Sequence, residues 1–489
     1  MYRPTLSEAR KLASEYKTIP VSREILSDVR TPIEVLKILK NISRHCFMLE
    51  SLESAETWGR YTFLGFDPKL ELTCVNGLVT INAGTTMTIN TVHPRIVIRQ
   101  ILDENKSPQL DYLPPFTGGL MGYFSYDYIK YNEPALKLDA EDQEGFKDVD
   151  LMLFDKIIAF DNLKQKIILI VNVKSAELET GYNKAVMELD NMVKLIQTGM
   201  YQKAEPAKIT SAFRRLFDKE AYCEMVEKAK HYIREGDIFQ VVLSNRMDAD
   251  FEGSLLNAYR VLRATNPSPY MFYISGDAIE VAGASPETLV KLQNGRLHTF
   301  PLAGTRPRGS TIEEDLQNEK DLLSDPKELA EHNMLVDLGR NDLGKISRFG
   351  TVTVEKYLSI ERFSHVMHIG STVQGEIQED KNAMDAVDAV LPAGTLSGAP
   401  KIRACEIINE LENSKRGIYG GAIGYVDFAG NMDTCIAIRI AFKKNGKVFV
   451  RSGAGIVADS VPENEYRECI NKAQAVINAL EMSEEVIDG

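Results

Sequence analysis

The chain has 489 residues, of which 44% are hydrophobic and 26% charged, and its formal net charge is −13. This composition is that of a globular protein of several domains, which excludes a largely disordered chain, and the acidic balance argues against a nucleic-acid-binding surface. No apolar run approaches the roughly 20 residues that a membrane span needs, so we expect no association with a membrane.

The first part of the chain is predicted to consist mainly of strands. Residues 70–89 alternate around an Asn-Gly pair at 76–77, and residues 151–173 contain two apolar runs separated by an Asp-Asn pair at 161–162. Such pairs between apolar or alternating runs are typical of tight turns. Both segments are therefore predicted to form β-hairpins.

A change of composition near residue 200 predicts a boundary. Residues 185–198 carry apolar side chains at helical spacing and are followed by a glycine, which predicts a helix that ends there. Residues 200–211 are polar and show no periodicity. We therefore divide the chain into an N-terminal region, 1–205, and a catalytic region, 206–489.

The second region mixes predicted helices and strands. One helix is predicted from Asp218, as its N-cap, to Gly236, another from Asp325 to about Gly339, and a last one over 462–482. Because hairpins outnumber regular β-α-β alternation, the fold class is predicted to be α+β. Strands are predicted at 239–243, 270–274, 278–282 and 288–292.

Two of the predicted helices each carry a pair of glutamates three residues apart. The pairs are Glu328 with Glu331 and Glu465 with Glu468, and at this spacing both carboxylates of a pair lie on one face of their helix. If the two faces meet, they form an oxygen-lined site for a hard cation such as Mg²⁺, with room for a substrate carboxylate. Each pair alone has a simpler explanation, because acidic residues in the first turn of a helix stabilise its dipole.

Glycine clusters in the second region are a further candidate for ligand binding. Successive glycine N–H groups can form anion-binding nests, but turns alone would explain any one cluster. The run GTLSGAPK at 394–401 is not a phosphate-binding loop, because a Walker motif has four residues between its glycines and a lysine directly after the second. The clusters contain Gly304, Gly394, Gly398, Gly420, Gly421, Gly453 and Gly455.

Several cations lie beside these glycines. Arg439 is the most unusual of them, because the run CIAIRIAF predicts a strand and an isolated charge in a core is costly. Its guanidinium is expected to meet a carboxylate, which belongs either to the protein or to a ligand. The other cations are Arg306, Arg308, Lys401 and Lys472.

Two histidines, His365 and His368, are three residues apart in the run FSHVMHIG. On a strand they face opposite sides, so a two-histidine metal site is not expected. One of them can serve as a catalytic base, although a histidine buried in a core is the commoner case. The six cysteines show no CxxC spacing, which indicates reduced thiols, and we expect a cytoplasmic protein.

In their order along the chain, the motifs of the second region resemble those of the chorismate-utilising enzymes. The motifs are PLAGTRPRG, ELAEHNMLVDLGRNDLG, HVMHIGSTV, GTLSGAPK, YGGAIGY, TCIAIR, SGAGIVADS and a final glutamate-rich helix that contains NKA. They cover about residues 280–475, and FMLESLESAETWGRYTFLGFDP at 47–68 extends the resemblance to nearly the whole chain. Within this family the large subunits (component I) of anthranilate synthases are the most similar.

The resemblance implies a large α/β sandwich in which two antiparallel sheets face each other, with helices outside and the active site in a cleft. It implies that Mg²⁺ is bound through Glu331 and Glu468, with Glu328 and Glu465 close by. It also implies a lyase that converts chorismate and ammonia to anthranilate and pyruvate, the first step of tryptophan biosynthesis.

The resemblance assigns roles to further residues. Glu287 matches the general acid of the family, and His368 and Thr395 match residues beside the reacting ring. The carboxylates of chorismate are expected to meet Gly304, Thr305, Tyr419, Arg439, Gly453, Ala454, Gly455 and Lys472.

Two positions distinguish between members of the family. Isochorismate and salicylate synthases carry a water-activating lysine where this chain has Gln240, and aminodeoxychorismate synthases typically carry a nucleophilic lysine where it has Ala303. With neither lysine present, direct attack by ammonia is favoured, and with it an anthranilate synthase. The alternatives are an aminodeoxychorismate synthase component I and, in a different class, a non-catalytic subunit that binds chorismate or tryptophan.

The resemblance also implies a partner and an inhibitor. Ammonia is expected to come from a glutamine amidotransferase subunit (component II), because no cysteine of this chain has the setting of a glutaminase nucleophile. The chain departs from the usual family pattern at Met48 and at Gly339, which is expected to end a helix. The residues that resemble the feedback site for L-tryptophan are Leu49, Glu50, Ser51, Pro269, Tyr270 and Met271.

Overall fold

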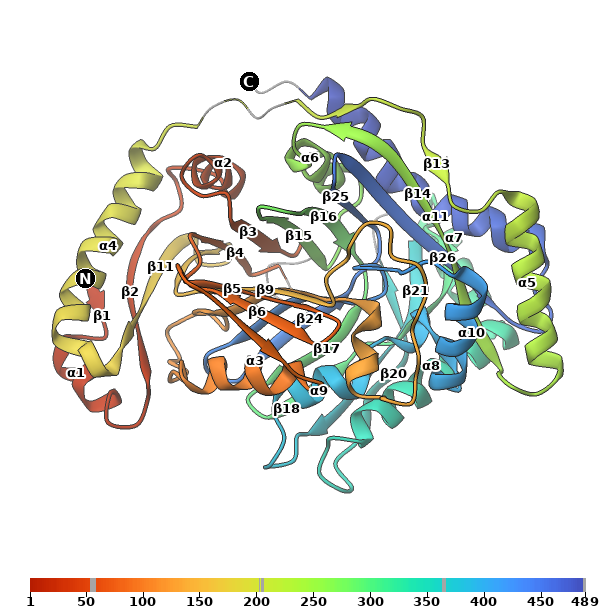
Figure 1. Ribbon diagram of the computed structural model, residues 1–489, viewed down its shortest axis with the longest axis horizontal. Coiled ribbons are helices and arrows are strands. Elements are labelled where there is room, and N and C mark those ends of the chain that lie inside the picture. Colours follow the sequence, from red (N-terminus) through yellow and green to blue (C-terminus); the bar gives the residue numbers. More distant parts are fainter. Residues whose placement is uncertain (53–58, 202, 204–205, 363–365, 487–489) are drawn as a thin grey trace.

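Two large antiparallel sheets form the framework of the protein (Figure 1). The computed structural model describes residues 1–52, 59–201, 203, 206–362 and 366–486. The first sheet runs in the order β1 (Tyr2–Arg3), β2 (Thr18–Leu26), β11 (Lys166–Lys174), β10 (Lys156–Asp161), β4 (Tyr61–Phe66), β3 (Cys46–Glu50), β15 (Tyr270–Ser275), β16 (Glu280–Ser285), β25 (Ile440–Lys444), β26 (Lys447–Ile456), β14 (Gln240–Glu252) and β12 (Lys208–Ile209), with β13 (Arg214–Arg215) and β22 (Gly398–Ala399) also paired to β14.

The second sheet is built in the same antiparallel way. Both sheets take strands from before and after residue 205, so the two predicted regions are interleaved in space, and the division at 205 stays a prediction. The strand order is β19 (Leu302–Pro307), β21 (Val366–Glu376), β18 (Arg296–Thr299), β17 (Thr288–Gln293), β24 (Met432–Ile436), β23 (Ala422–Asp427), β8 (Gly119–Phe124), β9 (Val149–Phe154), β5 (Leu70–Val75), β6 (Leu78–Asn82) and β7 (Thr86–Asn90), with β20 (Thr353–Arg362) paired to β21.

Helices cover the outer faces of both sheets. Apolar side chains of the two inner faces, among them Phe47, Phe154 and Phe442, pack together in an aromatic-rich core between the sheets. The helices are α1 (Leu6–Leu12), α2 (Pro32–Ile42), α4 (Leu178–Thr198), α6 (Leu256–Thr265) and α11 (Pro462–Met482) outside the first sheet; α3 (Pro94–Asp103), α8 (Pro326–Gly344) and α9 (Ala383–Val390) outside the second; and α5 (Lys219–Arg234), α7 (Ile312–Ser324) and α10 (Lys401–Glu412) near the end of the sandwich that carries β14 and β19. Short 3₁₀ turns lie at η1 (Tyr126–Tyr131), η2 (Ser175–Glu177), η3 (Gly394–Leu396) and η4 (Ser483–Glu485).

This architecture confirms the predicted fold class of α+β, with two facing antiparallel sheets and helices outside. The predicted hairpins are present as β5–β6 and β10–β11. The Asp218 side chain caps α5 by accepting a hydrogen bond from the N–H of Ala221, and α11 has the predicted bounds. These elements follow from local signals, because turn pairs and N-caps act within a few residues.

One predicted helix end is wrong. The helix that begins after Asp325 does not stop at Gly339 but continues as α8 to Gly344. A Cβ at Gly339 would lie 3.1 Å from the Cγ2 atom of Thr299. The glycine therefore lets α8 approach β18 closely, and it is a packing position rather than a helix end.

The chain passes between the two sheets several times, and two of these crossing points are neighbours. β16 of the first sheet leads into β17 of the second, and β24 of the second leads into β25 of the first, while β16 pairs with β25 and β17 with β24. The two crossing segments are joined by backbone hydrogen bonds, from Ile436 to the carbonyl of Glu287 at 3.0 Å and from Ala284 to the carbonyl of Arg439 at 3.2 Å. The fold thus holds Glu287 and Arg439 side by side.

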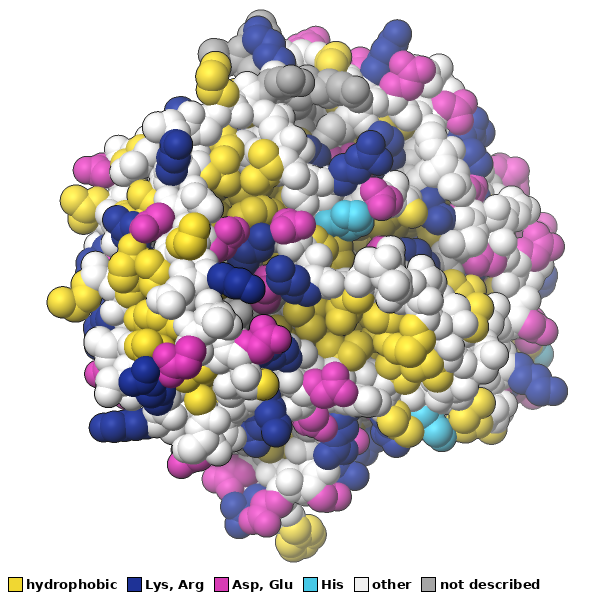
Figure 2. All heavy atoms as spheres, turned by 60° about the vertical axis from the view of Figure 1, so that its left-hand side comes forward, with side chains coloured by type: hydrophobic (Ala, Val, Ile, Leu, Met, Phe, Trp, Pro, Cys, Tyr) yellow, Lys and Arg dark blue, Asp and Glu magenta, His cyan; other side chains and the backbone are white. Residues whose placement is uncertain are grey.

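The surface shows mixed charge. On the face of the molecule that lies to the left in Figure 1, basic and acidic side chains are interspersed among apolar ones (Figure 2). No helix within the described residues is both long enough and apolar enough to cross a bilayer.

Candidate active site

Glu287 lies at the first crossing point, between β16 and β17, and its side chain is half-buried. The Thr395 hydroxyl, on η3, donates a hydrogen bond of 3.2 Å to Glu287 Oε1. Burial raises the pKa of Glu287 to about 7, against the opposing effects of the Thr395 hydrogen bond and the charges of Lys472 and Arg439. A carboxyl group in this state holds its proton in a large part of the molecules at neutral pH and can act as a general acid.

Arg439 lies at the second crossing point and departs from the prediction. It is not within a strand: β24 ends at Ile436, β25 begins at Ile440, and Arg439 has a left-handed φ of 52°. Its side chain reaches solvent inside the cleft and has no ion-pair partner among the residues that the structure describes. The cleft walls lower its pKa by desolvation, while the nearby Glu287 opposes this.

The other cations singled out from the sequence differ from Arg439, because the protein neutralises them. Arg306 contacts Asp321 and Asp325, at 2.7 and 2.9 Å, and Arg308 binds Asp315 through two nitrogens. Lys401 is nearly buried and donates to Asp342 at 2.9 Å. A guanidinium without a carboxylate partner, at the wall of an open cavity, is the feature expected of an anion receptor.

Gly304 and Thr305 lie in a bulge of β19. The register of β19 against β21 shifts between Ala303 and Arg306, and Gly304 has a φ of 65°. The Nδ1 atom of His368, on β21, lies 2.9 Å from the carbonyl oxygen of Gly304 and 3.1 Å from the hydroxyl of Thr305. Because a carbonyl can only accept, Nδ1 carries the proton of the neutral ring, and Nε2 is its basic nitrogen.

His368 is expected to be neutral at physiological pH. Burial lowers its pKa, the charge of Arg439 lowers it further, and the hydrogen bond with Gly304 opposes both effects. A neutral imidazole next to the bulge can accept a proton from a bound substrate. His365, the second histidine of the motif, lies outside the described residues.

Strand β26 carries the remaining glycines of the candidate site. The carbonyl of Gly453 accepts a hydrogen bond of 3.2 Å from Lys472 on α11, and a Cβ at Gly453 would lie 3.1 Å from the hydroxyl oxygen of the buried Tyr419. A Cβ at Gly455 would meet the side-chain nitrogen of Gln240 at 2.7 Å. Ala454 lies between the two glycines and is fully buried. Glycine at these two positions therefore lets β26 pack closely against Tyr419 and Gln240.

A buried ion network behind β26 was missed by the sequence analysis. Glu412 accepts hydrogen bonds from Arg416 and Arg451, the shortest of 2.6 and 2.8 Å, and from the backbone N–H and hydroxyl of Ser244 on β14. All three charged side chains are about 1% exposed. Arg451 in the apolar run KVFVRSGAGI was the available signal, since a charge in a buried strand requires a partner.

The four glutamates expected at the metal site come from opposite sides of the cleft. α8 packs on β19 and β21 of the second sheet, and α11 packs on β26 of the first. Burial raises the pKa of Glu331, and the charges of Glu328 and Glu468 raise it further. Burial and the charge of Glu468 likewise raise the pKa of Glu465. The carboxylates of the two helices are therefore near enough to repel one another.

This arrangement fits a cation, although it is not a closed ligand shell. Carboxylate oxygens are the donors that Mg²⁺ prefers, and a cation between like charges would relieve their repulsion. No three carboxylate, imidazole or thiol groups of the described residues stand close enough together to ligate one ion. Glu328 also contacts Arg306 at 3.3 Å, and Glu468 contacts Lys472 at 2.7 Å. The magnesium site stays a prediction.

Next to these residues the surface is hollowed. A cavity of about 490 Å³ opens beside α11 and is lined by Arg439, Glu468 and Lys472, together with Arg467 and two asparagines. It brings together the unpaired arginine, a second predicted substrate contact and a predicted metal ligand.

The residues that resemble a tryptophan site line one separate cavity of about 660 Å³: Leu49, Glu50, Ser51, Pro269, Tyr270 and Met271. The carboxylate of Glu50 already binds Arg263 and the hydroxyl of Tyr259, both at 2.6 Å. The hydroxyl of Tyr270 contacts Thr288 at 2.9 Å and Asp433 at 2.8 Å. Residues 53–58 of the neighbouring motif lie outside the described residues, and tryptophan binding stays a prediction.

Known proteins resemble this chain over almost its full length. A family model described as chorismate binding enzyme matches residues 44–478. Anthranilate synthase component 1 of Acetivibrio thermocellus is 46% identical, with 99% of this chain and 100% of the relative covered. Among solved structures, anthranilate synthase component I from Streptococcus pneumoniae TIGR4 has a TM-score of 0.77 at 38% identity, covering 92% of this chain and 98% of that one. The menaquinone-specific isochorismate synthase from Escherichia coli, at 19% identity, shares the fold with a TM-score of 0.69 over 97% of this chain and 98% of its own.

Proposed function

This chain belongs to the chorismate-binding enzymes and, within that family, to the component 1 chains of anthranilate synthase, and from this premise we propose how its cleft converts chorismate and ammonia to anthranilate and pyruvate. The observation that carries the proposal is the pair of side chains at the two crossing points. Arg439 has no carboxylate partner within the described part of the chain, and Glu287 beside it has a pKa of about 7. One receives an anion and the other delivers a proton.

Chorismate carries two carboxylates, so its receptor must supply positive charge or N–H donors. Arg439 can bind one carboxylate through two nitrogens. Lys472 lines the same cavity as Arg439 and donates to the carbonyl of Gly453, and we propose that the backbone N–H groups near Gly304 and Gly453 supply further donors. These groups orient the ring between the two sheets.

In the first step, ammonia forms a bond to C2 of the ring while the 4-hydroxyl leaves. Hydroxide is a poor leaving group, so Glu287 donates its proton to the departing oxygen, which leaves as water. Ammonia rather than water is the nucleophile in this proposal, because Gln240 and Ala303 replace the lysines that activate water or attack the ring in other members of the family. The product of the step is an aminodeoxyisochorismate.

In the second step, the ring becomes aromatic. His368 Nε2 takes the proton from C2, the electrons of that C–H bond enter the ring, and the bond between ring C3 and the ether oxygen breaks. The side chain leaves as the enolate of pyruvate, which takes up a proton at its methylene carbon to give pyruvate. The neutral state of His368, which burial favours, is the state that can accept this proton.

Glu331 and Glu468, with Glu328 and Glu465, would hold Mg²⁺ in this proposal. When bound, the ion supplies a counter-charge for the ring carboxylate and acts as a Lewis acid toward it. The glutamates of α8 and α11 have the right donor atoms, and their crowding is unfavourable without a cation.

We further propose that a glutamine amidotransferase subunit delivers the ammonia and that L-tryptophan inhibits the enzyme. The names of the relatives as component 1 imply a second component. The cavity lined by Leu49 and Tyr270 is large enough for an amino acid with an indole ring.

The function is tested by identifying the products formed from chorismate, Mg²⁺ and an ammonium salt. We expect anthranilate, detected by its fluorescence, and an equal amount of pyruvate. Arg439→Ala should lower kcat/KM by at least about 100-fold, because a charged hydrogen-bonded contact to the substrate is lost, whereas Arg10→Ala, which removes an exposed ion pair on α1, should change it less than twofold. An aminated product that retains its enolpyruvyl group, or no consumption of chorismate, would contradict the proposal.

A further inference from the structure

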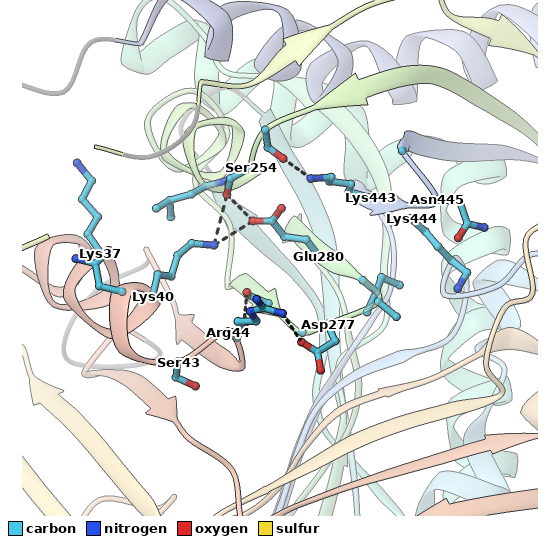
Figure 3. Close-up of a pocket in the computed structure, with 18 of the residues that line it drawn as sticks. Lys37, Lys40, Ser43, Arg44, Ser254, Asp277, Glu280, Lys443, Lys444 and Asn445 are labelled. Atoms are coloured by element: carbon cyan, nitrogen blue, oxygen red, sulfur yellow. Dashed lines mark hydrogen bonds and ion pairs between the residues drawn. The ribbon is translucent and has the colours of Figure 1, made fainter. Parts of the chain in front are cut away.

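A third cavity, of about 700 Å³, lies beside the strand ends of the first sheet (Figure 3). It is formed by the second half of α2, the start of β3, the turn between β15 and β16, and the turn between β25 and β26. None of the residues assigned above to chorismate, magnesium or tryptophan lines it. Its volume is in the usual range of pockets for small ligands.

The lining of this cavity is strongly basic, although the protein as a whole has a net charge of −13. Two carboxylates, Asp277 and Glu280, lie among a larger number of cations. A concave surface with one dominant sign of charge concentrates the electric field and attracts counter-ions. The cations are Lys37, Lys40, Arg44, Lys203, Lys443 and Lys444.

The carboxylate at the centre is already satisfied by the protein. Glu280 Oε1 accepts hydrogen bonds from Ser254 at 2.6 Å and from Lys40 at 3.3 Å, and also contacts the hydroxyl of Tyr273. Burial alone would raise its pKa, but the charge of Lys40 and these hydrogen bonds hold the pKa below its usual value. Figure 3 shows Lys40, Ser254 and Glu280 pointing toward one another. Glu280 therefore compensates one lysine and leaves the others.

Three further cations of the cavity, Arg44, Lys443 and Lys444, have no close carboxylate partner among the described residues. Lys443 donates to the backbone carbonyl of Gly253, and neither Lys443 nor Lys444 has a carboxylate partner among the residues described. Arg44 lies 3.9 Å from Asp277, with 88% of its side chain exposed. Lys447, on the next strand, pairs with Glu144 at 2.8 Å. The cations without compensation are thus concentrated at the cavity.

We propose that this cavity binds a small anion that carries phosphate groups, at a site separate from the active site. Lysine ammonium groups are compact charges that bind phosphate oxygens from several directions, and a phosphate ester brings about two negative charges to one point. Arg44, which precedes β3, and Lys443 and Lys444, on β25, all line this cavity. Its positive charge favours a ligand that carries more than one negative charge.

The proposal is tested with inorganic pyrophosphate as the probe, in isothermal titration calorimetry on the full chain in metal-free buffer. We expect saturable binding of one pyrophosphate per chain, with an affinity that falls as salt is added. The Lys443→Glu/Lys444→Glu double variant should bind at least tenfold more weakly. The matched control, Lys184→Glu/Lys194→Glu on the exposed face of α4, makes the same change of charge and should bind within twofold of the natural chain.

Two further measurements, competition with chorismate and binding of citrate, test whether the site is separate and selective for phosphate. Saturating chorismate should not displace pyrophosphate, because Arg439 and Lys472 belong to a different cavity, and citrate should bind at least tenfold more weakly than pyrophosphate. If the double variant unfolds, Lys444→Glu alone should still weaken binding about threefold or more. Absence of saturable binding, displacement by chorismate, equal affinity for citrate, or equal loss in the α4 control would overturn the proposal.

Discussion

At the scale of single residues, the proposed mechanism makes activity depend on the protonation of Glu287. In that mechanism the group must hold a proton to release the 4-hydroxyl, and its pKa is about 7. As the pH rises through 7, the protonated fraction falls. We therefore expect kcat/KM to decline on the alkaline side with an apparent pKa near 7, and Glu287→Gln to abolish the step that releases water, with a loss of about 10²–10⁴ in kcat. A pH–rate profile that stays flat between pH 6 and 9 would contradict this role.

Thr395 tunes that pKa, which gives a sharper test of the same contact. Its hydroxyl donates to Glu287 Oε1 and lowers the pKa of that carboxyl. Thr395→Val removes the donor, so the alkaline limb of the pH profile should move to higher pH. Thr434→Val is the control, because its hydroxyl donates to the carbonyl of Val290 instead. The role of Thr395 is wrong if the two variants have the same alkaline limb.

The sequence shows which residues carry a charge, but their ion-pair partners could not be predicted from it. Arg306, Lys401 and Arg439 are equally prominent beside glycines in the sequence. Only the folded chain shows that Asp321 and Asp342 neutralise the first two and that no described residue neutralises the third. Ion pairs join residues distant in the chain, and sequence spacing carries no information on them unless both lie on one helix.

At the scale of elements, strands β14 and β26 depend on the buried network of Glu412. This carboxylate compensates two guanidinium groups that are about 1% exposed. Glu412→Gln leaves two buried charges without a counter-ion and should lower the free energy of unfolding by about 3–5 kcal/mol. Glu406→Gln on the same helix, α10, breaks only a surface pair with Arg403 and should cost less than about 1 kcal/mol. Urea denaturation of both variants decides; equal effects would show that the network is not structural.

The cavity proposed for tryptophan is joined to the active site through Tyr270. The hydroxyl of Tyr270 contacts Thr288, the residue that follows Glu287, and Asp433. A ligand that displaces Tyr270 would therefore disturb the start of β17, next to the proposed general acid. Tyr270→Phe should raise the tryptophan concentration for half-inhibition at least fivefold, with kcat in the absence of tryptophan changed less than threefold.

Tyr112→Phe provides the control for that measurement. Tyr112 lines the same cavity, but its hydroxyl has no hydrogen-bond partner within the described structure. Its loss should leave inhibition unchanged. An equal shift in both variants would mean that the hydroxyl of Tyr270 has no special part in the coupling.

Turns and helix caps, which depend on neighbouring residues, could be predicted from the sequence. The points at which the chain leaves one sheet for the other could not. The Asn-Gly turn at 76–77 and the cap at Asp218 act within four residues, so a sequence reveals them. The run CIAIRIAF reads as one strand, yet it spans two sheets, because the chain turns at Arg439. Hydrophobic alternation is the same on both sides of such a turn, and it cannot show where a strand leaves its sheet.

At the scale of the whole molecule, the candidate active site takes its residues from both sheets. α8 lies over the second sheet and α11 over the first, and the residues between them come from positions 287 to 472. The basic cavity and the proposed tryptophan cavity lie near opposite ends of β3 and β15. The ordered succession of motifs predicted the family and the fold, but the placement of these cavities relative to the cleft required the structure.

The central claim is that glutamates of α8 and α11 bind one cation together, although these helices pack on different sheets. The most direct test is the affinity for Mg²⁺, measured by calorimetry on the natural chain and on Glu331→Gln, Glu468→Gln and Glu463→Gln. Glu463→Gln is the control, because Glu463 lies in the exposed first turn of α11 and its substitution removes the same charge. We predict that Glu331→Gln and Glu468→Gln each weaken Mg²⁺ binding at least tenfold while Glu463→Gln stays within twofold. A variant of either helix that binds Mg²⁺ as well as Glu463→Gln would contradict the account.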